Sequence, residues 1–178
     1  MQSIRSKLII GLVKRRHLFR FKLKPEVVDE TFSVKDFRDR IEHGSARMKL
    51  PDNIRIEPFK TGELYAEWII PENALKGKVL LYIHGGGFIS GSCATHRAHV
   101  AKFAAASQLK SLLFDYRLAP EHPFPAAVDD CVVAYRCLLE KGYKPENILV
   151  GGESAGATLT LSLLLALKQQ NISLPKAA

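Results

Sequence analysis

Hydrophobic and polar positions follow helical periods in the first third of the chain. Within residues 1–24, and again within residues 25–53, apolar residues recur at roughly helical spacing among charged ones. This spacing predicts helices in both segments, and the second is expected to end near Pro51.

After Pro51 the period shortens to that of β-strands. Residues 54–60 and 63–70 form short runs that alternate or are rich in β-branched residues, and Thr61-Gly62 separates them. Two such runs joined by a short turn predict a β-hairpin.

From residue 78 onward, apolar runs typical of buried strands alternate with segments of helical periodicity. The predicted strands are 78–83, 110–115 and 147–150, and the predicted helices are 94–107, 125–141 and 154–170. This alternation, with short connections, indicates an α/β fold whose sheet is mostly parallel and carries helices on both faces. Ligands bind at the carboxyl ends of the strands in such sheets, so candidate chemistry is expected there.

The charge of the chain is concentrated at its beginning. The net charge is +8, and residues 1–24 hold eight basic residues and no acidic one, which leaves 18 basic and 18 acidic residues elsewhere. The rest of the chain therefore has no charge excess that would favour binding to nucleic acid. Residues 1–24 are expected to form a helix that packs on the protein itself, and the alternatives are contact with an anionic membrane surface or a targeting peptide.

Three cysteines, Cys93, Cys131 and Cys137, show no metal-ligand spacing. Their odd number favours reduced thiols in a cytoplasmic protein, and neither a metal nor a cofactor is expected. No apolar stretch reaches the ~18 residues that a membrane-spanning helix needs.

The stretch Gly152-Glu153-Ser154-Ala155-Gly156 lies between a predicted strand and a predicted helix. A G-x-S-x-G sequence in this context is typical of a nucleophile elbow, in which the serine hydroxyl projects above the sheet. Gly152 and Gly156 would leave room for the tight turn and for close packing of the helix on a strand. Taken alone, however, the motif is more simply interpreted as a serine that caps the helix N-terminus.

The stretch His84-Gly85-Gly86-Gly87-Phe88 follows the first predicted parallel strand. Consecutive glycines allow backbone N–H groups to point into a cavity, as in the oxyanion hole of an acyl-transfer enzyme. A flexible turn or a phosphate-binding nest is the alternative, although the chain contains neither a P-loop nor a dinucleotide fingerprint. His84 is expected to hold the loop by hydrogen bonding and not to act as a base.

A third motif, DYRLAPEHPFPA at residues 115–126, follows the next predicted strand. Its charged residues can pair locally, and its prolines can fix the connection into the following helix. We expect it to be scaffolding near a site.

The three motifs together, HGGGF, DYRLAPEHPFPA and GESAG, each after a buried strand, resemble the hormone-sensitive-lipase-like family of α/β-hydrolase carboxylesterases. The resemblance covers about residues 52–172. It implies an α/β-hydrolase fold, with residues 1–50 as N-terminal cap helices and residues 51–178 as the first part of the catalytic domain.

The resemblance also implies roles for individual residues. Ser154 would be the nucleophile, and the backbone N–H groups of Gly86, Gly87 and Ala155 would form the oxyanion hole. By the same resemblance, four further motif positions have structural roles: His84, Asp115, Arg117 and Glu121. Glu153 stands where the family more often has Asp.

The family places its catalytic acid and then its histidine after the serine. The residues that follow Ser154 include no Asp, Glu or His. We therefore expect these residues to be the front portion of a hydrolase, incomplete at the C-terminus, whose acid and histidine come from a continuation or a second chain. Alone they are expected to be inactive and poorly soluble, with the strand at 147–150 left as an exposed apolar edge.

The expected function is hydrolysis of small to medium acyl esters through an acyl-serine intermediate. The alternative is a non-catalytic, receptor-like member of the same fold that binds a small ligand such as a carboxylate. An acid followed by a histidine beyond these residues would favour the enzyme, whereas a replaced histidine would favour the receptor. A broken gene product without function is a third possibility.

Overall fold

The computed structural model describes residues 4–14, 31–45 and 48–178. The chain divides into two compact units, residues 1–33 and residues 34–178. The first unit contains helix α1 (Ile4–Lys14), whose residues Ile4 and Leu8 are exposed. The expected packing of residues 1–24 on the rest of the protein stays a prediction, since part of that segment lies outside the described residues. No helix in the described ranges is long and apolar enough to span a bilayer.

The second unit contains every strand and helix predicted between residues 54 and 170, each boundary within two residues of its predicted position. In chain order the elements are α2 (Val34–Ser45), β1 (Ile54–Thr61), β2 (Leu64–Pro71), β3 (Val79–Ile83), α3 (Cys93–Ser107), β4 (Lys110–Phe114), α4 (Ala126–Glu140), the 3-10 turn η1 (Pro145–Asn147), β5 (Ile148–Gly152) and α5 (Ala155–Gln169).

The helix predicted over residues 25–53 was too long. Its described part, α2, begins at Val34 and ends at Ser45, and residues 48–53 are not helical. Gly44 in the last turn has a low helix propensity, and Pro51 disfavours helical geometry in the residue before it. The division into cap helices at 1–50 and a catalytic domain at 51–178 stays a prediction.

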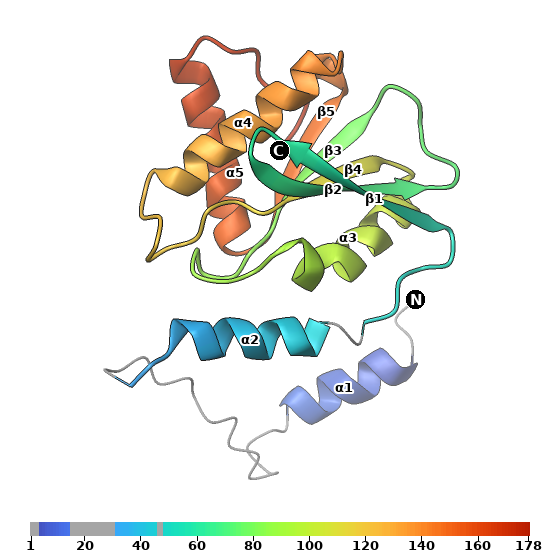
Figure 1. The fold of residues 1–178 in the computed structure, drawn as a ribbon. Helices are drawn as coiled ribbons and strands as arrows, with labels where there is room; N and C mark the ends of the chain where they lie inside the picture. Colours follow the sequence, from blue (N-terminus) through green and yellow to red (C-terminus); the bar gives the residue numbers. More distant parts are fainter. Residues whose placement is uncertain (1–3, 15–30, 46–47) are drawn as a thin grey trace. The chain divides into compact units, whose positions relative to one another are not determined.

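The sheet has the strand order β1-β2-β4-β3-β5. β3 pairs with β4 and with β5 in parallel, whereas β2 is antiparallel to both β1 and β4. Helices α4 and α5 cover one face of the sheet and α3 covers the other (Figure 1). The expected helices on both faces are therefore present, and the hairpin adds antiparallel pairings at one side of the parallel strands.

The predicted hairpin is confirmed, with its turn one residue later than expected. Thr61 pairs with Leu64, so the loop consists of Gly62 and Glu63. Gly62 has a φ of 61°, a left-handed value that glycine adopts without a steric penalty at the first position of such a loop.

The outer edge of β5 is paired, which corrects the expectation of an exposed apolar edge there. The Val150 N–H donates to the Ala177 carbonyl over 3.0 Å, and the Lys176 N–H donates to the Ile148 carbonyl over 2.9 Å. Before this pairing, the Tyr135 hydroxyl of α4 donates a hydrogen bond to the Ser173 carbonyl over 2.8 Å. The side chains of Ile148 and Val150 are buried.

Candidate active site

Ser154 forms the turn between β5 and α5 in a strained conformation. Its φ of 53° and ψ of −121° are values that residues with a Cβ rarely adopt. Its side chain is exposed and makes no capping hydrogen bond to α5. The simpler interpretation of Ser154 as a side-chain N-cap is therefore wrong, and the backbone has the sharp geometry of a nucleophile elbow.

Close approach of the elbow to the end of β3 explains the two flanking glycines. A Cβ on Gly152 would lie 2.6 Å from the Ile83 carbonyl oxygen, and a Cβ on Gly156 would overlap that same oxygen. A Cβ on Gly156 would also lie 2.7 Å from the carbonyl oxygen of His84. The predicted need for space at both glycines is confirmed, and the elbow lies directly against the start of the glycine loop.

The glycine loop after β3 turns through three consecutive positive φ values: 120° at Gly86, 64° at Gly87 and 65° at Phe88. The turn is closed by Ser90, whose hydroxyl and backbone N–H both donate to the Gly86 carbonyl, over 2.8 and 3.0 Å. With its carbonyl engaged, the peptide at Gly86 is held in one orientation.

The backbone N–H groups of Gly86, Gly87 and Ala155 are available as donors. Within the part of the chain that the structure describes, none of the three donates a hydrogen bond to another residue. Ala155 is the first residue of α5, where the helix dipole also favours negative charge. The family resemblance implies that these three groups form the oxyanion hole, and that role stays a prediction.

Glu153 ties the elbow to the glycine loop. Its carboxylate accepts hydrogen bonds from the Gly85 N–H over 2.8 Å and from the Tyr82 hydroxyl over 2.7 Å, and His96 Nε2 lies 2.9 Å away. Burial acts to raise the pKa of Glu153, but the hydrogen bonds from Tyr82 and Gly85, together with the electrostatic effect of the nearby His96, outweigh it and lower that pKa. From the sequence, Glu153 was notable only as a small departure from Asp, and its contact with the glycine loop was not predicted.

His84 holds the loop as expected. Its Nδ1 donates to the Gly85 carbonyl over 2.8 Å, and its ring stacks between Tyr116, at 4.2 Å, and His96, at 5.1 Å. Burial lowers the pKa of His84 to about 4, against the smaller opposite effect of the Gly85 hydrogen bond. A ring that is buried and neutral suits a structural role.

Asp115 and Arg117 also have the structural roles that the resemblance implied. The Asp115 carboxylate accepts a hydrogen bond from the Cys93 N–H at the start of α3, over 2.5 Å. Arg117 forms a bidentate pair with the buried Asp130 on α4, and the shortest distance is 2.7 Å. These contacts anchor the loop after β4 to helices on both faces of the sheet.

Glu121, in the same loop, pairs with Arg38 on α2, a residue that the sequence analysis did not single out. The shortest distance between the guanidinium and the carboxylate is 2.8 Å. This pairing lowers the pKa of Glu121 to about 2. The two residues are 83 positions apart, and no local pattern signals their contact.

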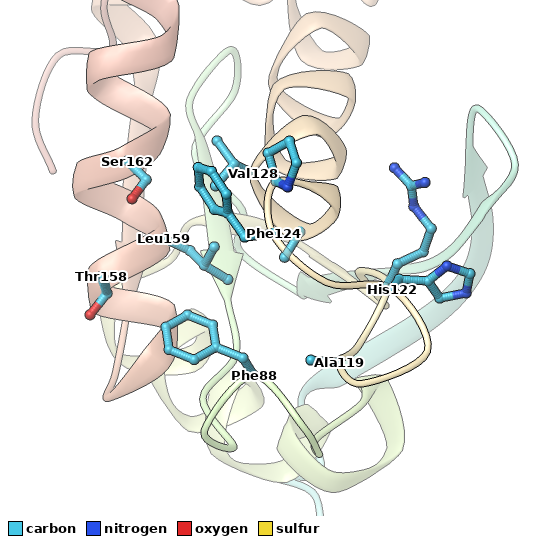
Figure 2. Close-up of a pocket in the computed structure, with 11 residues that line it drawn as sticks. Phe88, Ala119, His122, Phe124, Val128, Thr158, Leu159 and Ser162 are labelled. Carbon is cyan, nitrogen blue, oxygen red and sulfur yellow. The ribbon is translucent and has the colours of Figure 1, made fainter.

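A cavity of about 430 Å³ lies beside the glycine loop. Figure 2 shows Thr158, Leu159 and Ser162 of α5 on one side of it and Phe124 and Val128 on the other. The remaining lining residues are Phe88, Arg117, Ala119, His122, Pro125 and Ala127. The lining is mostly apolar, as in a site for a small organic ligand. The motif at 115–126, expected to be scaffolding, thus also supplies part of a cavity wall.

Comparison with known proteins agrees with this geometry. A profile of the α/β hydrolase fold family matches residues 80–178. An esterase of Acinetobacter venetianus is 40% identical over 122 residues, which are 68% of this chain and 40% of that protein. An acetyl-hydrolase of Streptomyces hygroscopicus is 39% identical over 140 residues, which are 79% of this chain and 46% of that protein.

A solved structure shows the same arrangement. An esterase from the bacterial hormone-sensitive lipase family superposes with a TM-score of 0.80 at 38% identity, over 98% of this chain and 56% of that one. The chain thus spans about half the length of the relatives it matches. The fold implied by the motifs is confirmed: the chain belongs to the α/β hydrolase fold family, and the relatives named above are hydrolases that include a hormone-sensitive-lipase-like esterase.

Proposed function

We propose that the protein is a carboxylic-ester hydrolase that works through an acyl-serine intermediate on Ser154. One observation carries the proposal: an exposed serine, held at a φ of 53° and without a capping role, beside a loop in which the Gly86 and Gly87 N–H groups donate no hydrogen bond within the described residues. Strain of this kind persists only where the surrounding structure maintains it, and it clusters at active sites.

In the proposed reaction the Ser154 oxygen attacks the ester carbonyl carbon, and its proton passes to a base. The carbonyl oxygen becomes negative and accepts hydrogen bonds from the N–H groups of Gly86, Gly87 and Ala155. Cleavage of the ester C–O bond leaves an acyl group on Ser154 and releases an alcohol that takes up the proton. Water then attacks the acyl-serine, which releases the carboxylic acid and restores the hydroxyl.

Three of the described histidines, His84, His96 and His122, lie near the candidate site, and none of them forms a hydrogen bond with the Ser154 side chain. His84 is buried against Tyr116, and His96 is paired with Glu153. His122 lies at the cavity on the side away from α5 (Figure 2). The family places its acid and histidine after the serine, and no Asp, Glu or His follows Ser154 in residues 155–178. We therefore infer that the catalytic acid and histidine come from residues other than 1–178, as a continuation or a second chain, and that residues 1–178 alone are inactive. A serine without a base is too weakly nucleophilic for ester hydrolysis near neutral pH.

Small to medium acyl esters are the proposed substrates. The cavity beside Phe88 has a mostly apolar lining and a volume of about 430 Å³, which lies within the range of sites that bind small organic molecules. The name acetyl-hydrolase, given to the Streptomyces relative, agrees with a short acyl group.

The test uses the native polypeptide that carries this sequence, with p-nitrophenyl acetate and butyrate as substrates and an organophosphate as probe. We expect turnover, a mass increase located on Ser154, and a loss of kcat of about 10⁴-fold or more in Ser154→Ala. Unchanged turnover in Ser154→Ala, or modification at another residue, would overturn the assignment. Ligand binding without turnover or labelling would instead support the non-catalytic, receptor-like alternative.

A further inference from the structure

Arg38 on α2 joins two loops of the candidate site. Its Nε donates to the Ile89 carbonyl over 2.6 Å, and its Nη2 donates to the Ala119 carbonyl over 2.9 Å. Both terminal nitrogens also bind the Glu121 carboxylate, over 2.9 and 2.8 Å. One guanidinium therefore engages the end of the glycine loop and the loop that follows β4.

The two carbonyls that Arg38 binds adjoin a direct contact between these loops. The Ala119 N–H donates to the Phe88 carbonyl over 2.9 Å, and Phe88 and Ala119 both line the cavity. Arg38 thus binds the carbonyl of Ile89, the residue after Phe88, and the carbonyl of Ala119. These carbonyls belong to the two segments that the Ala119–Phe88 hydrogen bond joins. The glycine loop is held at its start by Glu153 and at its end by Arg38.

Stability alone does not account for these contacts. The side chain of Glu121 is 54% exposed, and an ion pair so open to solvent contributes little to the stability of the fold. The planar guanidinium, however, reaches two carbonyls and a carboxylate in fixed directions, which an ammonium group cannot do. The contacts of Arg38 therefore fix the relative positions of the two loops more than they stabilise the fold.

We propose that Arg38 is a positioning residue, which sets the glycine loop and the cavity wall at Ala119 relative to each other. It acts through the backbone of Phe88 and Ile89 and touches no reacting atom. The inference rests on the proposed function, because the groups that Arg38 positions are the predicted oxyanion donors Gly86 and Gly87. A displacement of about 1 Å at such donors can cost about 100-fold in rate.

The experiment compares Arg38→Ala, Arg38→Lys and the control Lys35→Ala in the native polypeptide. Lys35 lies on the same helix and pairs with Asp39, away from the site. For each variant kcat and KM for p-nitrophenyl butyrate, the rate of organophosphate labelling of Ser154 and the melting temperature are measured. We expect Arg38→Ala to lower kcat and the labelling rate by about 10- to 100-fold, and Arg38→Lys by at least about tenfold. Lys35→Ala should match the wild type.

Chemical rescue separates positioning from general damage to the fold. Millimolar guanidinium should restore part of the Arg38→Ala rate, while potassium chloride at the same concentration should not. A wild type that is active and labelled at Ser154, together with Arg38 variants within twofold of it, would overturn this inference and leave the proposed function intact. A wild type that is not labelled at Ser154 would overturn the proposed function instead. If Arg38→Ala does not fold, Arg38→Lys decides by the same criteria.

Discussion

At the scale of single residues, the site stores strain in its backbone. Ser154 has a φ of 53°, and Phe88, also a residue with a Cβ, has a φ of 65°. Each such residue costs on the order of 1–3 kcal/mol that the surrounding structure must offset. Around Ser154 the offset comes from close packing of Gly152 and Gly156 on the end of β3.

The strain at Ser154 can be measured with two variants that both lack the hydroxyl. Glycine adopts a positive φ without a steric penalty, but it loses more backbone entropy on folding than alanine does. We expect Ser154→Gly to have a free energy of unfolding about 1 kcal/mol higher than Ser154→Ala, because relief of strain exceeds the entropy loss. Urea unfolding of both variants checks this, and equal stabilities would show that the turn is unstrained.

His84 should make stability depend on pH. Protonation would place an N–H at Nε2, which has no hydrogen-bond partner among the described residues. The folded pKa of about 4 lies below the usual 6.5, so the unfolded state binds more protons between these values and stability falls as the pH falls. The expected loss between pH 7 and pH 5 is about 2 kcal/mol. In urea titrations at both pH values, His84→Gln should lack this part of the loss, and an unchanged loss would contradict the assignment.

At the scale of elements, the site depends on contact between the start of α5 and the end of β3. A Cβ on Gly156 would overlap the Ile83 carbonyl oxygen, so α5 cannot approach β3 this closely with any other residue there. The chain sets the position of Ser154 through this packing, because the turn joins β5 directly to α5.

Two glycine-to-alanine changes in helices should therefore have opposite effects. Gly156→Ala is expected to destabilise the fold by about 3 kcal/mol or more, because backbone must move to admit the methyl group. Gly44→Ala in α2 should be neutral or stabilising by up to about 1 kcal/mol, since a Cβ there meets nothing within 4 Å. Thermal unfolding of both variants is the measurement, and similar effects would refute the packing argument.

Local patterns predicted the elements and the elbow, but not the contacts between them. The turn at Ser154 follows from neighbouring glycines between a strand and a helix, all within a few residues. Glu153 contacts Gly85, which lies 68 positions earlier in the chain. Arg38 likewise contacts Ile89 and Glu121, which are distant from it in the sequence. Such pairs are set by the tertiary arrangement, and a single sequence contains no signal for them. The pairing of Ala177 with β5 involves too few residues to form a pattern.

At the scale of the whole molecule, α2 belongs with the sheet and not with the preceding segment. Residues 34–178 form one compact unit, and α2 contacts it through Arg38 and through Glu42, whose carboxylate accepts a hydrogen bond from the Ser92 hydroxyl over 2.5 Å. The net charge of +8, by contrast, arises within residues 1–24.

Two truncations of the native polypeptide should therefore differ. Removal of residues 1–33 leaves α2 in place and is expected to preserve cooperative unfolding and the labelling of Ser154. Removal of residues 1–50 also removes Arg38 and should lower the labelling rate by about 10- to 100-fold, as in Arg38→Ala. Thermal unfolding and organophosphate labelling of both truncations check this. Equal labelling rates would show that α2 does not influence the site.

The carboxylate of Glu153 affects how Ser154 and the glycine loop move relative to each other. Glu153 is the residue before Ser154, and its carboxylate accepts a hydrogen bond from the Gly85 N–H of the glycine loop. One side chain therefore links the serine to the glycine loop. We expect the thermal displacements of the two to be correlated, so that the distance between them fluctuates less than the position of either one. Phe124, across the cavity from Leu159 of α5 (Figure 2), is by contrast 86% exposed, so we expect its side chain to move more than the serine and the glycine loop do. In the proposed enzyme, the groups that carry out the reaction would thus be held more rigidly than the cavity wall around Phe124.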